Sequence, residues 1–339
     1  MKFGIHILPT YMPQVEGPLP DFYQQMYAQI IEVEKLGFDQ AWVTEHHFGG
    51  YGGTLPHPPT FLAAVACKTT KIRLGVAVAV LPLHNPLQVA EAYAMADVIS
   101  NGRLDFGIGK GSEPVEYRKF GLNRDEATPR FIEAMEIIRQ AWSDGPIKFR
   151  GEFYHYENVD ILPKPVQRPH PRVWVGATRS EETFGWAGKN GYDLMTVPFV
   201  HPTTDALRDL VRLYRKELAD NGHDFVGRDV LGKFHIYVSD SFERGMREAA
   251  PFMKNYSDIH TAVDPGRKIT ERDIGSDMAR GFIIVGDPER CADTIRRWQR
   301  EAGITVFSGT FHFGGMPQEM ALKSTRLFAE RVMPALESL

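Results

Sequence analysis

The sequence has little cysteine, no long hydrophobic run and no cluster of basic residues. Its two cysteines, Cys67 and Cys291, cannot form a disulfide framework, which favours a reducing compartment. The longest apolar stretches, such as 74–83, reach only about half of a membrane span. Lys and Arg total 39 against 43 Asp and Glu and never exceed two in a row, which argues against a nucleic-acid partner. We therefore expect a cytoplasmic globular protein with no membrane partner.

What the sequence does contain is a regular alternation of short apolar segments with longer amphipathic ones. The segments 2–8, 38–44 and 72–81 are typical of buried strands. In 20–36 and 86–99, apolar residues recur every three or four positions, which predicts helices. Further strands are expected at 103–108, 172–176, 192–197, 232–238 and 305–311, and further helices at 58–69, 125–142, 180–188, 204–220, 242–255, 288–302 and 317–336. Roughly eight such units ending on a helix favour a closed α/β barrel, the (β/α)8 TIM barrel, over an open doubly wound sheet.

The length fits one barrel that carries insertions. At roughly 150 residues per domain, 339 residues suggest two domains, but such barrels often exceed ~250 residues as one. The alternation lapses in 145–171, which is rich in Pro and aromatic residues, and in the polar segment 255–280. We predict a single domain over 1–339, with short strands at 147–149 and 153–156 in the first insertion and an irregular second insertion.

Two adjacent histidines follow the second predicted strand. In a (β/α)8 barrel, function gathers at the carboxyl ends of the strands. An imidazole there can act as an acid, a base or a metal ligand, although a single histidine is more often structural. His46 and His47 are therefore candidate catalytic residues. No HxH or HExxH spacing occurs, so we expect no metal site and keep a metal-dependent hydrolase only as an alternative.

Two loops after the fourth and fifth strands contain glycines, hydroxyls and a cation. The segment 107–112 matches neither a dinucleotide fingerprint nor a P-loop, yet Lys110 can meet a phosphate as a point charge. Thr178 and Ser180 can cap the following helix, and Thr183 lies in its first turn, where free N–H groups form an anion site. A structural turn or an ordinary helix cap explains each feature when that feature is considered alone. Together they place an imidazole, a cation and an anion site at one face of one barrel.

Several ordered segments resemble the bacterial luciferase-like family of flavin-dependent monooxygenases and oxidoreductases. The resemblance is carried by 41–48 (AWVTEHHF), 81–86 with 88–91, 97–105 (DVISNGRLD), 107–111 (GIGKG), 120–121, 285–288 (VGDP) and 327–334 (LFAERVMP). Any one fragment is weak evidence, whereas their order and spacing across most of the chain are specific.

The resemblance implies a fold, a cofactor and partners. It implies a (β/α)8 barrel with insertions that binds FMN without a covalent bond and uses its reduced form with dioxygen to oxygenate a small organic substrate. It further implies a separate flavin reductase that supplies reduced FMN, and a homodimer. Two alternatives are a deazaflavin-dependent hydride-transfer oxidoreductase and a non-catalytic flavin-binding protein.

The resemblance also implies roles for particular residues. His46, with His47 second, matches the family's histidine beside the flavin. A cis peptide bond under the flavin falls between Ala77 and Val78. The segment 255–280 takes the place of the family's mobile lid.

The remaining implied residues surround the cofactor. Around the phosphate we expect Lys110, Ser112, Arg130, Thr178, Arg179, Ser180 and Thr183, and beside the isoalloxazine ring the backbone of Val175, Gly176 and Ala177. Lys110 stands where the family commonly has arginine, and it lacks the two-pronged hydrogen bonding that arginine offers a phosphate. For the substrate side we expect apolar and aromatic residues such as Phe3, Trp42, Phe48, Tyr51 and Phe199.

Overall fold

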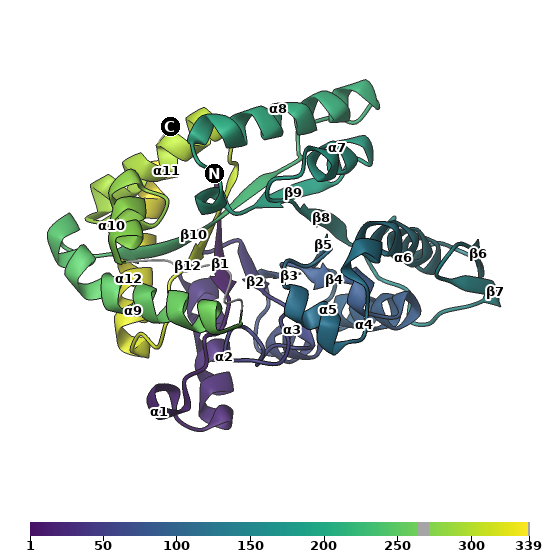
Figure 1. The fold of residues 1–339 in the computed structure, drawn as a ribbon, viewed down its shortest axis with the longest axis horizontal. Coiled ribbons are helices and arrows are strands. Elements are labelled where there is room, and N and C mark those ends of the chain that lie inside the picture. The colour runs from purple at the N-terminus through teal and green to yellow at the C-terminus, as the bar shows by residue number, and fades with distance from the viewer. Residues whose placement is uncertain (264–270, 338–339) are drawn as a thin grey trace.

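The computed structural model, which describes residues 1–263 and 271–337, is a closed barrel of parallel strands surrounded by helices (Figure 1). The barrel strands are β1 (Lys2–Ile7), β2 (Gln40–Val43), β3 (Arg73–Val76) continued by β4 (Ala79–Val80), β5 (Leu104–Gly109), β8 (Arg172–Gly176), β9 (Asp193–Thr196), β10 (Val230–Val238) and β12 (Val306–Thr310). Strand β12 pairs with both β1 and β10, which closes the barrel. The predicted (β/α)8 fold is confirmed.

Helices alternate with these strands and surround the barrel. They are α1 (Pro13–Glu16), α2 (Leu19–Lys35), α3 (Pro58–Ala66), α4 (Pro86–Ile99), α5 (Pro114–Lys119), α6 (Ala127–Trp142), α7 (Glu181–Lys189), α8 (Thr204–Asp220), α9 (Phe242–Val263), α10 (Glu271–Arg280), α11 (Pro288–Ala302), α12 (Gln318–Leu327) and α13 (Met333–Glu337). The bounds of α4, α8 and α11 agree with the predicted ones, because each has a capping side chain before its first turn: Asn85, Thr203 and Asp287. Within the described ranges, no helix combines the length and the apolar character that crossing a bilayer requires.

The first insertion forms an antiparallel hairpin that stands off the body of the barrel (Figure 1). Its strands are β6 (Ile147–Arg150) and β7 (His155–Val159), the second starting two residues later than predicted. Where the chain returns to the barrel, the buried carboxylate of Asp97 accepts hydrogen bonds from the backbone N–H groups of Val166 and Gln167. The hairpin is therefore anchored at its base.

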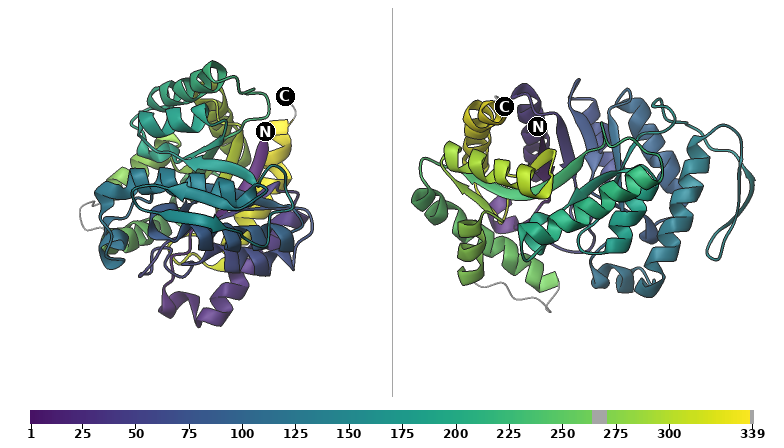
Figure 2. Two further views of the ribbon diagram at one scale, coloured as in Figure 1. Left: turned by 90° about the vertical axis from the view of Figure 1, so that its right-hand side faces the viewer. Right: turned by 90° about the horizontal axis from the view of Figure 1, so that it is seen from above.

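The prediction of an irregular second insertion is wrong for the described part of 255–280. Helix α9 continues to Val263 and α10 begins at Glu271, while the part of the prediction at 264–270 lies outside the described residues. Helix α9 packs against the edge of the sheet at which β11 (Ile284–Gly286) pairs with β10, and α10 packs on α9. Two further views of the barrel and its helices are shown in Figure 2. The buried residues that join α9 and α10 are Ala249, Met253, Tyr256, Ile274 and Met278. Apolar side chains at spacings of three and four residues thus form helical faces within an otherwise polar segment.

The barrel interior is apolar at its amino end and polar toward its carboxyl end. Trp42 and Trp174 meet edge to face with ring centroids 5.2 Å apart and pack with Leu231. Toward the carboxyl end of β10, the next inward-facing side chains after Leu231 are those of Lys233 and His235. Because the apolar layer fills the barrel, any chemistry is confined to the carboxyl ends of the strands, as in other barrels of this kind.

Candidate active site at the carboxyl ends of the strands

A cis peptide bond joins Ala77 and Val78 between β3 and β4, where the sequence comparison places one. The N–H of Ala77 donates to the carbonyl of Val43 on β2 at 2.8 Å, so this bond lies next to the end of the histidine strand. Glycines on the neighbouring strands leave room for the Val78 side chain. A Cβ would lie 2.5 Å from a Val78 methyl at Gly109 and 2.7 Å from one at Gly176. The site therefore requires glycine at both positions.

His46 is held by a carboxylate from a helix that we did not predict. Its Nδ1 lies 3.1 Å from Oε1 of Glu116, a buried residue of α5, and the same oxygen accepts the backbone N–H of His47 at 2.8 Å. The ring of Tyr51 packs against the imidazole in a tilted arrangement, with centroids 5.0 Å apart. Nε2 of His46 has no hydrogen-bond partner among the described residues. The imidazole is thus oriented by one nitrogen and has the other available for proton transfer.

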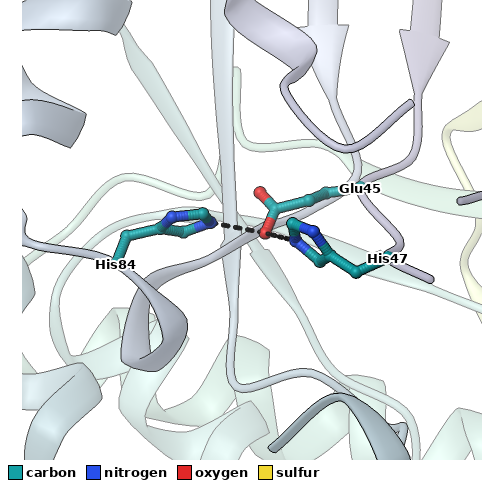
Figure 3. Close-up of side chains that lie close together, drawn as sticks. All are labelled: Glu45, His47 and His84. Carbon is teal, nitrogen blue, oxygen red and sulfur yellow. Dashed lines mark hydrogen bonds and ion pairs between the residues drawn. The ribbon is translucent and has the colours of Figure 1, made fainter. Parts of the chain in front are cut away.

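His47 belongs to a different cluster from His46 (Figure 3). Oε1 of Glu45 lies 3.2 Å from Nε2 of His47 and 2.6 Å from Nε2 of His84. Burial favours the neutral form of Glu45, but the hydrogen bonds from the two histidines outweigh it and lower its pKa to about 2. Burial alone would lower the pKa of His84, but the hydrogen bond that His84 makes to the Glu45 carboxylate outweighs burial and raises this pKa. The adjacent histidines therefore point to separate partners, and the second lies in a buried ion-pair cluster.

One possible ligand atom from each of Glu45, His47 and His84 lies within 4.8 Å of the other two, which is a spacing that a metal ion can bridge. Two imidazoles and one carboxylate are also a ligand set that some metal enzymes use. In this structure Glu45 is satisfied by the two histidines and by the N–H of Val80. The absence of a metal stays a prediction, which metal analysis of the purified protein tests.

Replacing Glu45 with glutamine is expected to destabilise the protein and to lower the pKa of His84. The amide keeps the shape but loses the charge that offsets the burial of the imidazole. We expect a loss of about 1–3 kcal/mol in the free energy of unfolding, measured by chemical denaturation, and a lower His84 pKa in an NMR titration. Glu301→Gln at the exposed end of α11 is the control. An unchanged His84 pKa would contradict this account.

Lys110 follows β5 and lies beside the start of α6. Its Nζ donates to Oγ1 of Thr128 at 3.1 Å, and its backbone carbonyl accepts the hydroxyl of Tyr117. Ser112 is turned away from it, because its hydroxyl donates to Glu113 at 3.0 Å. Of the two predicted phosphate ligands in this loop, Lys110 is the one that offers a positive charge.

The loop after β8 lies next to that of β5, since the two strands are paired. Ser180 caps α7 and accepts the N–H of Thr183, while Thr178 precedes it in the same loop. Arg179 is turned toward the next loop, where its guanidinium donates twice to the carbonyl of Val200. The loop therefore offers hydroxyls and the N-terminus of α7, with the Arg179 charge directed elsewhere.

Arg130 is paired within its own helix. Its guanidinium donates to Glu126 at 2.9 and 2.7 Å and lies 4.2 Å from the ring centroid of Phe153 in the hairpin insertion. Val175, Gly176 and Ala177 end β8 as predicted, and the N–H of Ala177 donates to the β9 carbonyl of Met195. The barrel thus brings the predicted loops together, while Arg130 has a carboxylate partner that the sequence did not indicate.

The inward-facing residues differ from the apolar substrate side that we expected. Phe3 packs outside the barrel against Phe328, and Phe48 is half exposed at the surface. Trp42 lies in the apolar layer below. Tyr51 and Phe199 do lie at the carboxyl end, against His46 and His235 respectively. The interior above the tryptophans is polar, which the local sequence did not reveal because β10 is buried on both faces.

Imidazoles, a carboxylate and a cationic loop gather at the carboxyl end of a closed (β/α)8 barrel, the end at which enzymes of the TIM-barrel class carry their active sites. The model of the luciferase-like monooxygenase family matches residues 1–305, and the chain belongs to this family. It is therefore an oxidoreductase.

Named relatives support this assignment. The uncharacterized protein y4wF of Sinorhizobium fredii is 32% identical over 309 residues, which cover 88% of each chain. The oxygenase component of the flavin-dependent trigonelline monooxygenase of Acinetobacter baylyi is 30% identical over 226 residues, 65% of this chain and 61% of that one. The crystal structure of monooxygenase RslO1 from Streptomyces bottropensis superposes with a TM-score of 0.92 at 29% identity, covering 98% and 99% of the two chains.

Two more distant structures share the fold and differ in cofactor. The oxygenating constituent of 3,6-diketocamphane monooxygenase from Pseudomonas putida, in complex with FMN, has a TM-score of 0.82 at 18% identity, covering 99% of this chain and 98% of that one. The coenzyme F420 dependent tetrahydromethanopterin reductase of Methanopyrus kandleri has a TM-score of 0.72 at 19% identity, covering 99% of each. At these identities the likeness concerns the fold alone.

Proposed function

We propose that the protein is an FMN-dependent monooxygenase that oxygenates a small organic substrate. The observation that carries the proposal is the His46–Glu116 pair, an imidazole held at one nitrogen, which follows β2, the strand whose Val43 carbonyl accepts the N–H of Ala77. The family membership and the relatives named as flavin-dependent monooxygenases support the reaction type.

The residues of the strand ends fit a flavin. The glycines at 109 and 176 leave space on either side of Val78, and buried polar atoms inside the barrel, such as Nε1 of Trp174 and Oγ1 of Thr196, lack a protein partner in the described structure. Lys110 and the N-terminus of α7 would hold the phosphate through a cation and free N–H groups. When bound and reduced, FMN supplies the electrons that activate dioxygen.

Protein groups would supply the proton chemistry and the dry environment. His46 would donate or accept a proton at Nε2, with Glu116 fixing the ring at Nδ1. Helix α9 shields this end of the barrel, because the hydroxyl of its Tyr256 lies 3.0 Å from that of Tyr51 and the ring of His260 also packs on Tyr51. Excluding water in this way protects reactive oxygen chemistry.

Reduced FMN would come from a separate reductase, in keeping with a relative that is named as an oxygenase component. The homodimer implied by the sequence resemblance stays a prediction. Anaerobic titration of the purified chain with reduced FMN and, separately, with the reduced deazaflavin coenzyme F420 tests the cofactor. Adding oxygen in the presence of aldehydes, ketones and terpenoids then tests for oxygenated product. Tight deazaflavin binding without FMN binding would overturn the proposal, and FMN binding without any product would favour a binding protein.

Replacing Lys110 with methionine is expected to weaken FMN binding but not riboflavin binding. Riboflavin lacks the phosphate, so the difference between the two ligands isolates the interaction with the Lys110 ammonium group. A hydrogen bond to a charged group contributes roughly 1.5–3 kcal/mol, which predicts a loss of about 10- to 100-fold in FMN affinity. Fluorescence titration measures both. Lys189→Met, at the other end of α7, is the matched control. Equal weakening of both flavins would show that Lys110 does not contact the phosphate.

A further inference from the structure

A buried lysine without a counter-ion lies in the polar part of the barrel. Lys233 on β10 is 6% exposed, and none of the described carboxylates forms an ion pair with it. Its Nζ is 5.9 Å from the ring centroids of Phe199 and Tyr256, which offer only weak attraction at that distance. Buried charges in proteins are ordinarily paired. A folded chain that retains this lysine unpaired is suited to receive an anion from outside.

The groups around Lys233 are hydrogen-bond donors that also lack partners. Both ring nitrogens of His235, which is fully buried, and Nδ1 of His6 have no hydrogen-bond partner in the described structure. The hydroxyls of Ser308 and Thr310, on the strand paired with β10, are unpartnered as well. Burial is the cause that lowers the pKa of Lys233, and no neighbouring carboxylate contributes. Five polar side chains thus converge without protein partners.

This cluster lies within reach of the proposed catalytic histidine. The ring of His235 packs on Tyr256 with centroids 4.5 Å apart, Tyr256 contacts Tyr51, and Tyr51 contacts the ring of His46. His6 lies on β1 beside β2, the strand that His46 follows, and burial together with the neighbouring Lys233 and His46 lowers its pKa. A ligand bound at Lys233 would therefore extend toward His46.

We propose that Lys233, with His6 and His235, binds a carboxylate of the substrate, so that the enzyme acts on small organic acids. The inference rests on the proposed function, since it assigns the substrate class of that same site. A carboxylate supplies the counter-charge that Lys233 lacks and accepts hydrogen bonds from the imidazoles and hydroxyls, which compensates for its burial. A neutral substrate leaves the ammonium group unpaired, and a cationic one is repelled by it.

Calorimetric titration of the FMN-loaded protein with matched acids and amides tests the proposal. The probe pairs are benzoate and benzamide, nicotinate and nicotinamide, and hexanoate and hexanamide. We expect at least one acid to bind about tenfold or more tightly than its amide, because the ion pair adds a charge-assisted bond. In Lys233→Met this ratio should fall to about one while amide binding is unchanged. Lys216→Met, an exposed lysine on α8, should keep the wild-type ratio.

Three results would contradict the proposal of a carboxylate site. Equal binding of acids and amides, or no binding of any acid, would show that no carboxylate site exists. Weaker FMN binding in Lys233→Met with the acid preference retained would assign the lysine to the flavin instead. The same titrations on the flavin-free chain separate the two proposals. An acid preference that persists in a chain that neither binds FMN nor forms product would leave the carboxylate site standing and overturn the monooxygenase.

Discussion

Replacing His46 with glutamine is expected to reduce product formation by about 100- to 10,000-fold, the range typical for removal of a general acid or base. The amide can still donate a hydrogen bond to Glu116 but cannot change its protonation state near neutral pH. FMN binding should be nearly unchanged, because the phosphate residues lie on other strands. Single-turnover assays with reduced FMN, oxygen and a substrate that the wild type converts measure the loss.

Two further variants make this test specific. His155→Gln changes an exposed histidine of the hairpin insertion and should leave turnover intact. Glu116→Gln removes the charge that orients His46 without touching the proton-transferring nitrogen, so we expect a smaller loss and a shifted pH profile. If His46→Gln turns over as fast as the wild type, His46 is not catalytic, and another group transfers the proton.

Replacing Lys233 with methionine is expected to stabilise the folded protein by roughly 5 kcal/mol near pH 6. Burial lowers the pKa of Lys233 to about 7, whereas lysine in an unfolded chain has a pKa of roughly 10.4. Each pKa unit corresponds to about 1.4 kcal/mol, and both states are protonated below pH 7, where the full penalty applies. Methionine has a similar shape and no charge to desolvate.

The pH dependence identifies the cause of this stabilisation. Between about pH 7 and pH 10 the unfolded wild type holds a proton that the folded form lacks, so its free energy of unfolding rises with pH. The advantage of Lys233→Met should therefore shrink as the pH rises through this window. Urea unfolding at several pH values measures it, with Lys216→Met as a control that stays level. A variant less stable than the wild type near pH 6 would reveal an anionic partner for the lysine.

The proposed ligand binding explains why the protein retains a lysine that destabilises its ligand-free form. Active sites commonly hold groups that cost stability and that function requires. The two effects of one substitution, higher stability and lost carboxylate preference, would together distinguish a ligand-binding lysine from one that has only a structural role.

Most of the barrel was predictable because its signals are local. Each of the helices α4, α8 and α11 has a capping residue and a series of buried apolar residues, and these two signals lie within one short segment of sequence. Helix α5 has only six residues, too few for a periodic pattern, so its Glu116 was missed. The helices within 255–280 were missed because only a few apolar residues, such as Ile274 and Met278, mark their buried faces within an otherwise polar segment.

The sequence by itself determined the (β/α)8 fold, the two insertions and the strand ends that hold the candidate residues. Only the tertiary structure decided which of these residues meet. Glu116 reaches His46 across 70 positions of the chain, and Arg130 pairs with Glu126. Strand β10 is buried along its whole length, so no alternation indicates which of its side chains face inward. Closure of the barrel places Lys233 inside it with no counter-ion among the described residues. This unpaired positive charge is the physical basis for proposing a substrate that carries a carboxylate.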